Sequence, residues 1–356
     1  MDAREVWRIS RSGSLGRLKR QVESLAHPGP GEARVAVKAI GLNFADLFAC
    51  LGLYSATPSG AFVPGLELAG VVEAVVPAPS ASHVGGGEGR ALRPGDRVFG
   101  LTRFGSYATA LNLDLRYLWP IPAAWSFAEA AAYPVQALTA WYGLIELGAL
   151  RPGAAVLVHS AAGGVGLHAL AVLRAHDARA IATVGREAKR DFLVERCGLV
   201  PDQVIVRNRR HFRMQLDRAL TAMQVDGFDL IFDAVAGPFF WPAYERLRPG
   251  GRLVLYGVAD LMPRGGRPNY LGLGLKYLRR PRLDPLQMIA KNRSVMAFNL
   301  IWLWDQVERL SDVYEHMAGV VRTPSFVGRR FPFTDAIGAL RYLQSGESIG
   351  KVVLEV

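Results

Sequence analysis

One long stretch without charged residues limits what this chain can fold into. Residues 154–173 include no Asp, Glu, Lys or Arg. A membrane-spanning helix needs about 20 mainly apolar residues, so the length alone is compatible with a span. However, Ser160 and three glycines, Gly163, Gly164 and Gly166, lie at its centre, and glycines in that position weaken a helix. We therefore predict no transmembrane segment.

The residues on the two sides of these glycines have different patterns. Residues 154–159 form a short apolar run typical of a strand, whereas residues 167–174 repeat apolar residues at helical spacing. A strand, a glycine turn and a helix in this order are typical of dinucleotide sites, where a bare backbone lets a pyrophosphate approach the helix N-terminus. The fingerprint G-x-G-x-x-G has alanine in its first position here, and the alternative is a turn that only allows tight packing. The cofactor-binding residues predicted in this turn are Ala162, Gly163, Gly164, Val165 and Gly166.

The rest of the chain contains two kinds of sequence. After the glycine turn, apolar runs at 178–184, 204–206, 228–232, 252–256 and 295–300 alternate with helix-like segments. This alternation predicts an α/β fold with a doubly wound parallel sheet. Residues 1–125 instead contain short strands separated by Pro and Gly, and the Gly- and Ser-rich insert 77–94 is predicted to be a flexible surface loop. Since 356 residues exceed the usual size of one core, we expect two domains.

The strand that follows the turn predicts which dinucleotide binds. An NAD site usually places Asp or Glu about 20 residues after the glycines, where it contacts the ribose 2′-hydroxyl. Here the strand ends in TVGREAKR, which offers Arg186 and Lys189 and no carboxylate at its tip. We therefore predict that these cations bind the 2′-phosphate of NADPH. Alternatively, they are surface charges of the next helix.

Composition limits the partners without selecting one. The net charge of +11 favours anionic partners such as nucleotides, acidic lipid surfaces or nucleic acid. The basic clusters 207–213 and 276–282 are not part of a recognisable nucleic-acid motif, so we predict no nucleic-acid partner. The chain has only two cysteines and an N-terminus without an apolar segment, and we expect a cytoplasmic protein.

Five motifs, in this order, give the chain a family resemblance. They are AIGLNFADLFACLGLY (39–54), VPGLELAGVV (63–72), RPGDRVFG (93–100), SAAGGVG (160–166) and GKVVL (350–354). The chain resembles the zinc-free quinone oxidoreductases of the medium-chain dehydrogenase/reductase superfamily. Within that family, residues 256–278 and 283–300 look most similar to the subgroup of synaptic-vesicle amine transport protein homologues.

The resemblance implies an architecture and a cofactor position. It implies a GroES-like β-rich catalytic domain at 1–125, completed by 301–356, and a Rossmann NADPH-binding domain at 126–300. NADPH is then expected in the cleft between the two domains. The resemblance also implies a homodimer.

The same resemblance implies chemistry without a metal. Zinc relatives have a Cys where this chain has Asn43 and a His where it has Leu66, and neither residue is a good zinc ligand. We therefore predict no metal site. Without zinc, hydride transfer from NADPH is easier to an electron-poor small molecule, a quinone or a conjugated carbonyl compound. An enoyl or 2-alkenal double-bond reductase is the nearest alternative.

Individual site residues follow from the family motifs. Asn43 and Asp46 are expected to border the nicotinamide and the substrate, and Tyr54 matches a proton-donating tyrosine of related enoyl reductases, although it could equally be a packed aromatic residue. Arg207 replaces a tyrosine that relatives often have near the adenosine phosphate. The further cofactor-binding residues implied by the resemblance are Thr139, Gly257, Val258, Ala259, Phe298, Asn299 and Lys351.

A protein that keeps the reductase fold but binds lipids or membranes is the alternative from another functional class. Residues 270–304 interleave aromatic and aliphatic residues with four cations, Lys276, Arg279, Arg280 and Arg282. A basic, aromatic-rich segment of this kind can lie on an anionic membrane surface. It can also form a substrate-pocket wall or a dimer interface, so the three interpretations stay open.

Overall fold

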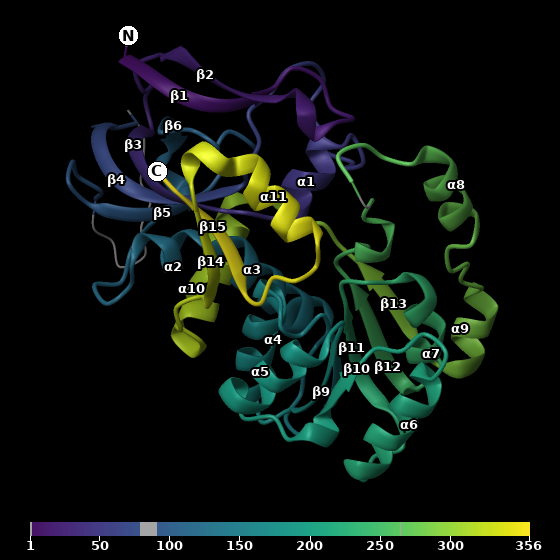
Figure 1. The fold of residues 1–356 in the computed structure, drawn as a ribbon. Helices are drawn as coiled ribbons and strands as arrows, with labels where there is room; N and C mark the ends of the chain where they lie inside the picture. The colour runs from purple at the N-terminus through teal and green to yellow at the C-terminus, as the bar shows by residue number, and fades with distance from the viewer. Residues whose placement is uncertain (1, 79–90, 264) are drawn as a thin grey trace.

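The structure is a computed structural model, and it describes residues 2–78, 91–263 and 265–356. Most of the insert that the sequence predicts to be a flexible loop, 79–90, lies outside the described residues. The two ends of the chain lie at the same end of the molecule (Figure 1). The chain has the mixed α/β fold that the sequence predicts.

The N-terminal part of the chain forms a sheet that the C-terminal segment completes. The seven-stranded sheet has β6 paired with β3 beside the path β14-β15-β3-β4-β5-β7, and β15 is antiparallel to β3. In β3, the apolar side chains of Val35, Val37 and Ile40 are buried. A separate two-stranded sheet is formed by β1 (Asp2–Ile9) and β2 (Leu18–Leu25). The strands of the larger sheet are β3 (Glu32–Gly41), β4 (Glu67–Val76), β5 (Arg97–Leu101), β6 (Ala110–Asp114), β7 (Leu118–Pro120), β14 (Val327–Pro332) and β15 (Lys351–Glu355).

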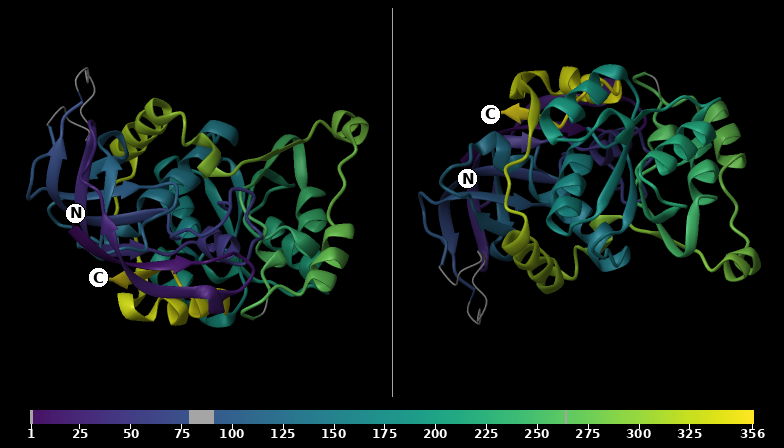
Figure 2. Two further views of the ribbon diagram at one scale, coloured as in Figure 1. Left: turned by 90° about the horizontal axis from the view of Figure 1, so that it is seen from above. Right: turned by 90° about the horizontal axis from the view of Figure 1, so that it is seen from below.

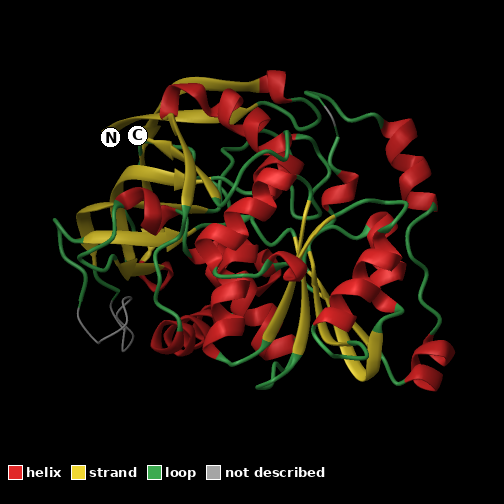
Figure 3. Ribbon diagram, turned by 60° about the horizontal axis from the view of Figure 1, so that its bottom comes forward, coloured by secondary structure: helices red, strands yellow, loops and turns green. Residues whose placement is uncertain are grey.

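The middle of the chain forms a six-stranded parallel sheet. Its order is β10-β9-β8-β11-β12-β13, which is the order 3-2-1-4-5-6 of doubly wound dinucleotide-binding folds. Helices cover both faces of this sheet (Figure 3), which explains why its strands read as nearly continuous apolar runs. The strands are β8 (Ala155–His159), β9 (Arg179–Val184), β10 (Val204–Val206), β11 (Phe228–Asp233), β12 (Leu247–Leu255) and β13 (Ser294–Ala297).

A short helix, α1, lies in the part of the chain that the sequence predicts to be β-rich with little helix. Its N-terminus is capped by the Asp46 carboxylate, whose Oδ2 accepts from the Asn43 N–H at 2.8 Å. The described α-helices are α1 (Phe44–Cys50), α2 (Phe127–Ala131), α3 (Pro134–Trp141), α4 (Gly164–Ala175), α5 (Glu187–Cys197), α6 (Phe212–Ala222), α7 (Phe240–Tyr244), α8 (Tyr270–Leu278), α9 (Pro285–Lys291), α10 (Val307–Val320) and α11 (Ala336–Gln344).

Two contacts position the parts around a site. The carboxyl ends of β8 and β11 are neighbours at the point where the strand order reverses, which is where open α/β sheets bind ligands. There the N–H of Gly350 donates to the Ala162 carbonyl at 2.7 Å, joining the C-terminal segment to the glycine turn.

The green segment with α8 and α9 lies at the edge of the molecule farthest from the chain ends (Figure 2). Within the described ranges, no helix is long and apolar enough to cross a membrane.

Candidate functional site

The glycine turn between β8 and α4 has a bare outer face. Ser160 adopts φ 55°, and the chain then enters α4 at Gly164. A Cβ added to Gly166 would lie 2.5 Å from the Ala161 Cα and from the Ser160 oxygen, so this glycine is needed for packing inside the turn. A Cβ on Gly163 would meet only the Ser160 oxygen, at 3.2 Å. No other described atom occupies the space that Gly163 leaves open.

This bare face fits a diphosphate. The 12-residue helix α4 starts directly behind it, and the N–H groups of a helix's first turn have no partners within the helix. Val165 lies in this first turn, and Gly164 packs against the Gln136 side chain, whose Oε1 would be 3.1 Å from an added Cβ. The five predicted residues of the turn are therefore brought together at a helix N-terminus, as an anion site requires.

The two glycines differ in a way that a pair of variants can test. We expect Gly163→Ala to fold like the parent chain but to bind NADPH at least about tenfold more weakly, because its methyl group would fill the place of a phosphate oxygen. Gly166→Ala should instead lower the thermal midpoint, since its methyl group overlaps backbone. Calorimetric titration and thermal unfolding of both variants measure this contrast. Equal NADPH binding by Gly163→Ala and the parent would contradict a diphosphate at this face.

Three cations gather beyond the end of β9. Burial is the main cause that lowers the pKa of Lys189 to about 8, and repulsion from Arg207 and Arg186 lowers it further. Arg186 is exposed and forms an ion pair with Glu347 at 3.2 Å. Arg207 is half-buried, and burial lowers its pKa to about 10. Cations this close together disfavour one another unless an anion lies between them.

A buried network holds Arg207 in place. The guanidinium can only donate, so it donates to Thr183 Oγ1 at 2.8 Å, and the Thr183 hydroxyl forms a hydrogen bond with His159 Nδ1 at 3.0 Å. Burial lowers the pKa of His159 to about 4, which keeps the ring neutral. In the described part of the chain, His159 Nε2 and Asp233 Oδ2 are buried without hydrogen-bond partners.

The loops after β11 and β12 frame the same edge of the sheet. Asp233 Oδ1 accepts from the N–H groups of Val235 and Ala236 at 2.7 and 3.0 Å, so this carboxylate caps the turn after β11. After β12, Gly257 packs closely against Ala234, and the N–H of Ala259 donates to the Ala234 carbonyl at 3.0 Å. Val258, between them, is 37% exposed. The predicted residues 257–259 therefore form a loop tied to the neighbouring strand end.

A buried polar cluster joins the glycine turn to the other sheet. Lys351 Nζ lies 2.6 Å from Glu67 Oε1, with exposed side-chain fractions of 4% and 0%. Asn43 donates through Nδ2 to Glu67 Oε1 at 2.9 Å and accepts from Lys351 Nζ at 2.8 Å. Gln136 Nε2 donates to Asn43 Oδ1 at 2.7 Å. Since Gln136 also packs against Gly164, this cluster links Asn43 and Lys351 to the dinucleotide turn.

Asp46 lies behind Asn43, away from solvent. Its Oδ2 accepts from the Asn43 N–H at 2.8 Å and from the Tyr107 hydroxyl at 3.2 Å. Complete burial raises the pKa of Asp46 to about 7. Its other oxygen, Oδ1, has no partner among the residues that the structure describes. In this arrangement Asp46 contacts the rest of the site through Asn43.

Tyr54 faces the residues that follow β13. Its hydroxyl donates to Asn299 Oδ1 at 2.8 Å. Burial, the largest cause, raises the pKa of Tyr54 to about 12, so the phenol keeps its proton near neutral pH. Next to Asn299, the Phe298 ring packs edge-on against Tyr142, with ring centres 5.1 Å apart. Thr139 is buried on α3 near the same region, one turn before Tyr142.

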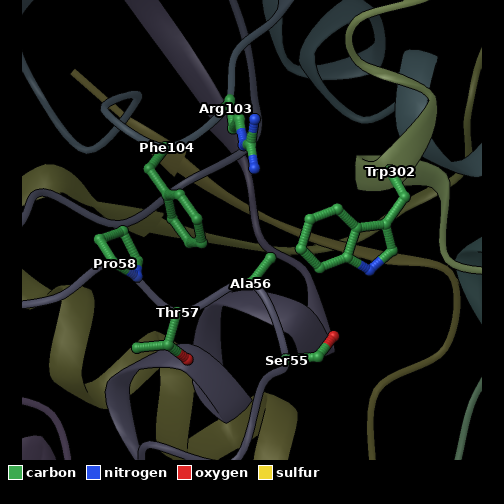
Figure 4. Close-up of a pocket in the computed structure, with 7 residues that line it drawn as sticks. All are labelled: Ser55, Ala56, Thr57, Pro58, Arg103, Phe104 and Trp302. Atoms are coloured by element: carbon green, nitrogen blue, oxygen red, sulfur yellow. The ribbon is translucent and has the colours of Figure 1, made fainter.

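A hollow of about 360 Å³ opens beside Tyr54. Residues 55–58 form one wall, Arg103 and Phe104 a second, and Trp302 of η7 (Leu300–Leu303) a third, as Figure 4 shows. The volume lies in the range of small-molecule pockets, about 300 to 1,000 Å³. This pocket is therefore the candidate site for an acceptor molecule.

Sequence reasoning found the turn and the strand-end cations but missed several residues. Glu67, Gln136 and Thr183 each bond to a predicted site residue, His159 bonds to Thr183, and Arg103 lines the pocket. Two of the buried residues carried a signal: Glu67 and Lys351 are isolated charges in apolar strands, which is unusual unless they are paired. The described residues include no group of three His, Cys, Asp or Glu that could hold a metal ion. The absence of a metal site stays a prediction.

Family models match two parts of the chain. Residues 29–123 match the alcohol dehydrogenase GroES-like domain, and residues 201–354 match the zinc-binding dehydrogenase family. A synaptic vesicle membrane protein VAT-1 homolog of Rattus norvegicus is 34% identical over 331 residues, which are 92% of this chain and 77% of that protein.

Solved structures share the whole arrangement. The quinone oxidoreductase from Thermus thermophilus, solved alone and with NADPH, is 28% identical, with a TM-score of 0.73 over 99% of this chain and 100% of that one. The CurK enoyl reductase is 26% identical, with a TM-score of 0.79 over 99% of both chains.

Proposed function

The chain belongs to the medium-chain dehydrogenase/reductase superfamily, with VAT-1 homologues among its relatives, and on this premise we propose that it is a zinc-independent, NADPH-dependent reductase of quinones or conjugated carbonyl compounds. The bare face of Gly163, with three cations beyond the next strand, is the observation that carries this proposal. The NADPH complex of the Thermus thermophilus quinone oxidoreductase supports it.

Residues on both sides of the cleft would hold the cofactor. The turn at 162–166 would bind the diphosphate, and Arg186, Lys189 and Arg207 the 2′-phosphate. Asn43, Thr139, Phe298 and Lys351, with the loop 257–259, would surround the rest of the cofactor. When bound there, a reduced nicotinamide supplies a hydride. Asp46, which contacts Asn43 and lies away from the pocket, would orient the Asn43 backbone and would therefore be a positioning residue.

The chain's own ammonium group supports the absence of zinc. Lys351 Nζ lies against Asn43 Oδ1 and Glu67 Oε1 at 2.8 and 2.6 Å. A metal ion at Asn43 would meet this positive charge at close range. Lys351 therefore already supplies a positive charge next to Asn43, and it forms an ion pair with the Glu67 carboxylate.

Tyr54 fits the role of a proton donor for one class of acceptor. Reduction of an enone adds a hydride to one carbon and requires a proton on its neighbour, whereas a reduced quinone can take its protons from water. The Tyr54 phenol is protonated near neutral pH, and Asn299 orients it. Tyr54 lies directly before the pocket wall at 55–58.

NADPH oxidation with a naphthoquinone, an alkenal, an enoyl thioester and no acceptor tests this proposal. We expect Tyr54→Phe to slow the alkenal about 100-fold and the naphthoquinone less than about threefold, because general acid catalysis contributes about 10² to 10⁴. Asn299→Asp keeps an acceptor for the phenol and is the control for orientation. Equal alkenal rates in Tyr54→Phe and the parent would exclude the proton-donor role, and no acceptor-dependent oxidation would exclude the reductase.

Binding to an anionic lipid surface is a second candidate function, and the exposure of α8 and α9 favours it. Leu271, Leu286 and Ile289 are 79%, 75% and 76% exposed. The four cations at 276–282 lie in the same exposed segment. Large exposed apolar side chains beside cations are typical of interfacial helices.

Sedimentation with vesicles tests the lipid surface. We expect binding to vesicles with acidic lipid, loss of binding in high salt because the charges are screened, and no binding to neutral vesicles. Changing the four cations at 276–282 to Gln should abolish binding, whereas the control R329Q/R330Q on β14 should not. Salt-independent binding, or none, would reject this candidate.

Three further expectations stay proposals. We propose a catalytic domain of residues 1–125 completed by 301–356, and a cofactor domain of residues 126–300. The pairing of β15 with β3 supports this division. A homodimer is proposed on the resemblance alone, and a cytoplasmic location on the low number of cysteines.

A further inference from the structure

The candidate acceptor pocket contains one charged side chain, Arg103. Its guanidinium points between the rings of Phe104 and Trp302 (Figure 4), and its central carbon lies 5.6 Å from the Trp302 ring centre. Over the ranges 2–78, 91–263 and 265–356, no carboxylate forms an ion pair with Arg103. The pocket therefore presents a positive charge without a partner from these residues.

The turn that contains Arg103 has a strained backbone. Phe104, the next residue, has φ 72°, a left-handed conformation that is costly for a bulky residue and persists only where its surroundings fix it. The Thr102 hydroxyl donates to the Phe104 carbonyl at 2.5 Å, and the Gly105 N–H donates to the Val63 carbonyl at 2.9 Å. Strained turns of this kind cluster at ligand sites.

The pocket adjoins the proposed reaction site. The Phe104 ring centre lies 6.4 Å from that of Tyr54. On the other side, the backbone N–H of Trp302 donates to the backbone carbonyl of Asn299 at 3.1 Å, and the Asn299 side chain accepts from the Tyr54 hydroxyl. A molecule between Phe104 and Trp302 would thus lie beside the phenol.

These features together determine what the pocket selects. Two aromatic walls favour a flat, conjugated molecule. An arginine beside aromatic rings pairs strongly with carboxylate, sulfonate or phosphate, because its planar group can stack and donate two hydrogen bonds at once. Resting on the reductase function proposed above, we propose that Arg103 selects acceptors that carry an anionic group, on the acceptor itself or on its carrier, in addition to their electron-poor conjugated system.

The anionic group could belong to the acceptor itself or to a carrier. A small acceptor would bring its own carboxylate or sulfonate, whereas an enoyl thioester of coenzyme A would bring the phosphates of the carrier. Two matched pairs of acceptors distinguish these sources. One pair is a naphthoquinone sulfonate and its parent naphthoquinone, and the other is crotonyl-coenzyme A and crotonyl-N-acetylcysteamine.

The test compares kcat/KM of the parent chain with that of Arg103→Gln for each acceptor, so that differences in intrinsic reactivity cancel. We expect Arg103→Gln to lower kcat/KM at least about tenfold for the anionic member of one pair and less than about threefold for its neutral member. The tenfold loss corresponds to one hydrogen bond to a charged group. The pair that shows this split identifies the source. Trp302→Leu should lower kcat/KM for both members of that pair.

Arg329→Gln is the matched control. Arg329 also lies over an aromatic ring, 4.9 Å from the Phe331 ring centre, but on β14, an edge strand of the seven-stranded sheet. Arg329→Gln should leave kcat/KM unchanged for all four acceptors. Equal effects of Arg103→Gln on both members of each pair, or no effect on any, would overturn the selectivity.

A binding measurement separates this inference from the reductase function. Calorimetry with naphthalene sulfonate needs no turnover, and Arg103→Gln should weaken its binding at least about tenfold relative to the parent. If no acceptor is reduced but this difference is found, the reductase function fails while the anion subsite stands. Equal binding by both chains would overturn the subsite.

Discussion

Lys351→Met should lower the free energy of unfolding by about 3 to 5 kcal/mol, because it leaves the Glu67 carboxylate buried without its cation. The two side chains are 4% and 0% exposed and their charged atoms lie 2.6 Å apart. The same change removes a hydrogen-bond donor from Asn43 Oδ1, at 2.8 Å. Urea denaturation monitored by circular dichroism measures the loss.

Two further variants separate the buried charge from other causes. Glu67→Gln in the Lys351→Met background removes the uncompensated charge and should recover a large part of the stability. Arg330→Met breaks the exposed pair between Arg330 and Glu355, whose exposed fractions are 51% and 48%. It should cost about 0 to 1 kcal/mol. Similar losses of unfolding free energy for Lys351→Met and Arg330→Met would show that the buried pair stabilises the protein no more than the exposed pair.

NADPH should bind at least about tenfold more tightly than NADH, since each charged contact to the 2′-phosphate contributes about 1.5 to 3 kcal/mol. Arg207 is the residue best fixed for this contact, because Thr183 and His159 hold it. We expect Arg207→Leu to raise the dissociation constant of NADPH about tenfold and that of NADH less than about twofold. Isothermal titration with both nucleotides measures these constants.

The control lies on the same helix as Lys189. Arg190 already pairs with Glu187 at 2.9 Å and with Asp191 at 3.4 Å, so Arg190→Leu should leave both dissociation constants unchanged. Equal affinities of the parent chain for NADPH and NADH would remove the assignment of all three cations.

The same preference should depend on pH. Burial, with repulsion from Arg207 and Arg186, lowers the pKa of Lys189 to about 8 in the free protein. A bound phosphate dianion favours the charged amine, so the NADPH affinity should fall as the pH rises above about 8, and it should also fall below about pH 6, where the phosphate itself gains a proton. The NADH affinity should not follow this change.

The sequence predicted the parts of the site that depend on neighbouring residues. The turn at 162–166 is contiguous, and Arg186 and Lys189 follow the next strand directly, whereas Arg207 and the loop 257–259 were expected only from the family resemblance. The carboxyl ends of parallel strands meet at one edge, which explains why these residues all lie at that edge. The bounds of the elements were less predictable: the run 295–300 was expected to be one strand, but β13 ends at Ala297 and Leu300 begins a short helix.

The remaining features depend on contacts between distant residues. Lys351 and Asn43 are 308 positions apart in the chain, and a buried charge next to an apolar run indicates that a partner exists without showing which. Arg103 has the same local pattern as any surface arginine. The next residue, Phe104, has a positive φ at a position where the sequence has no glycine.

The hydrogen bond between Gly350 and Ala162 determines when the site can form during synthesis. The turn at 160–166 leaves the ribosome almost two hundred residues before Gly350, Lys351 and β15. Until those last residues emerge, Glu67 has no ammonium partner and β3 has an unpaired edge toward β15. A nascent chain that stalls before Gly350 therefore lacks this contact with Ala162, and its parallel sheet must fold without it.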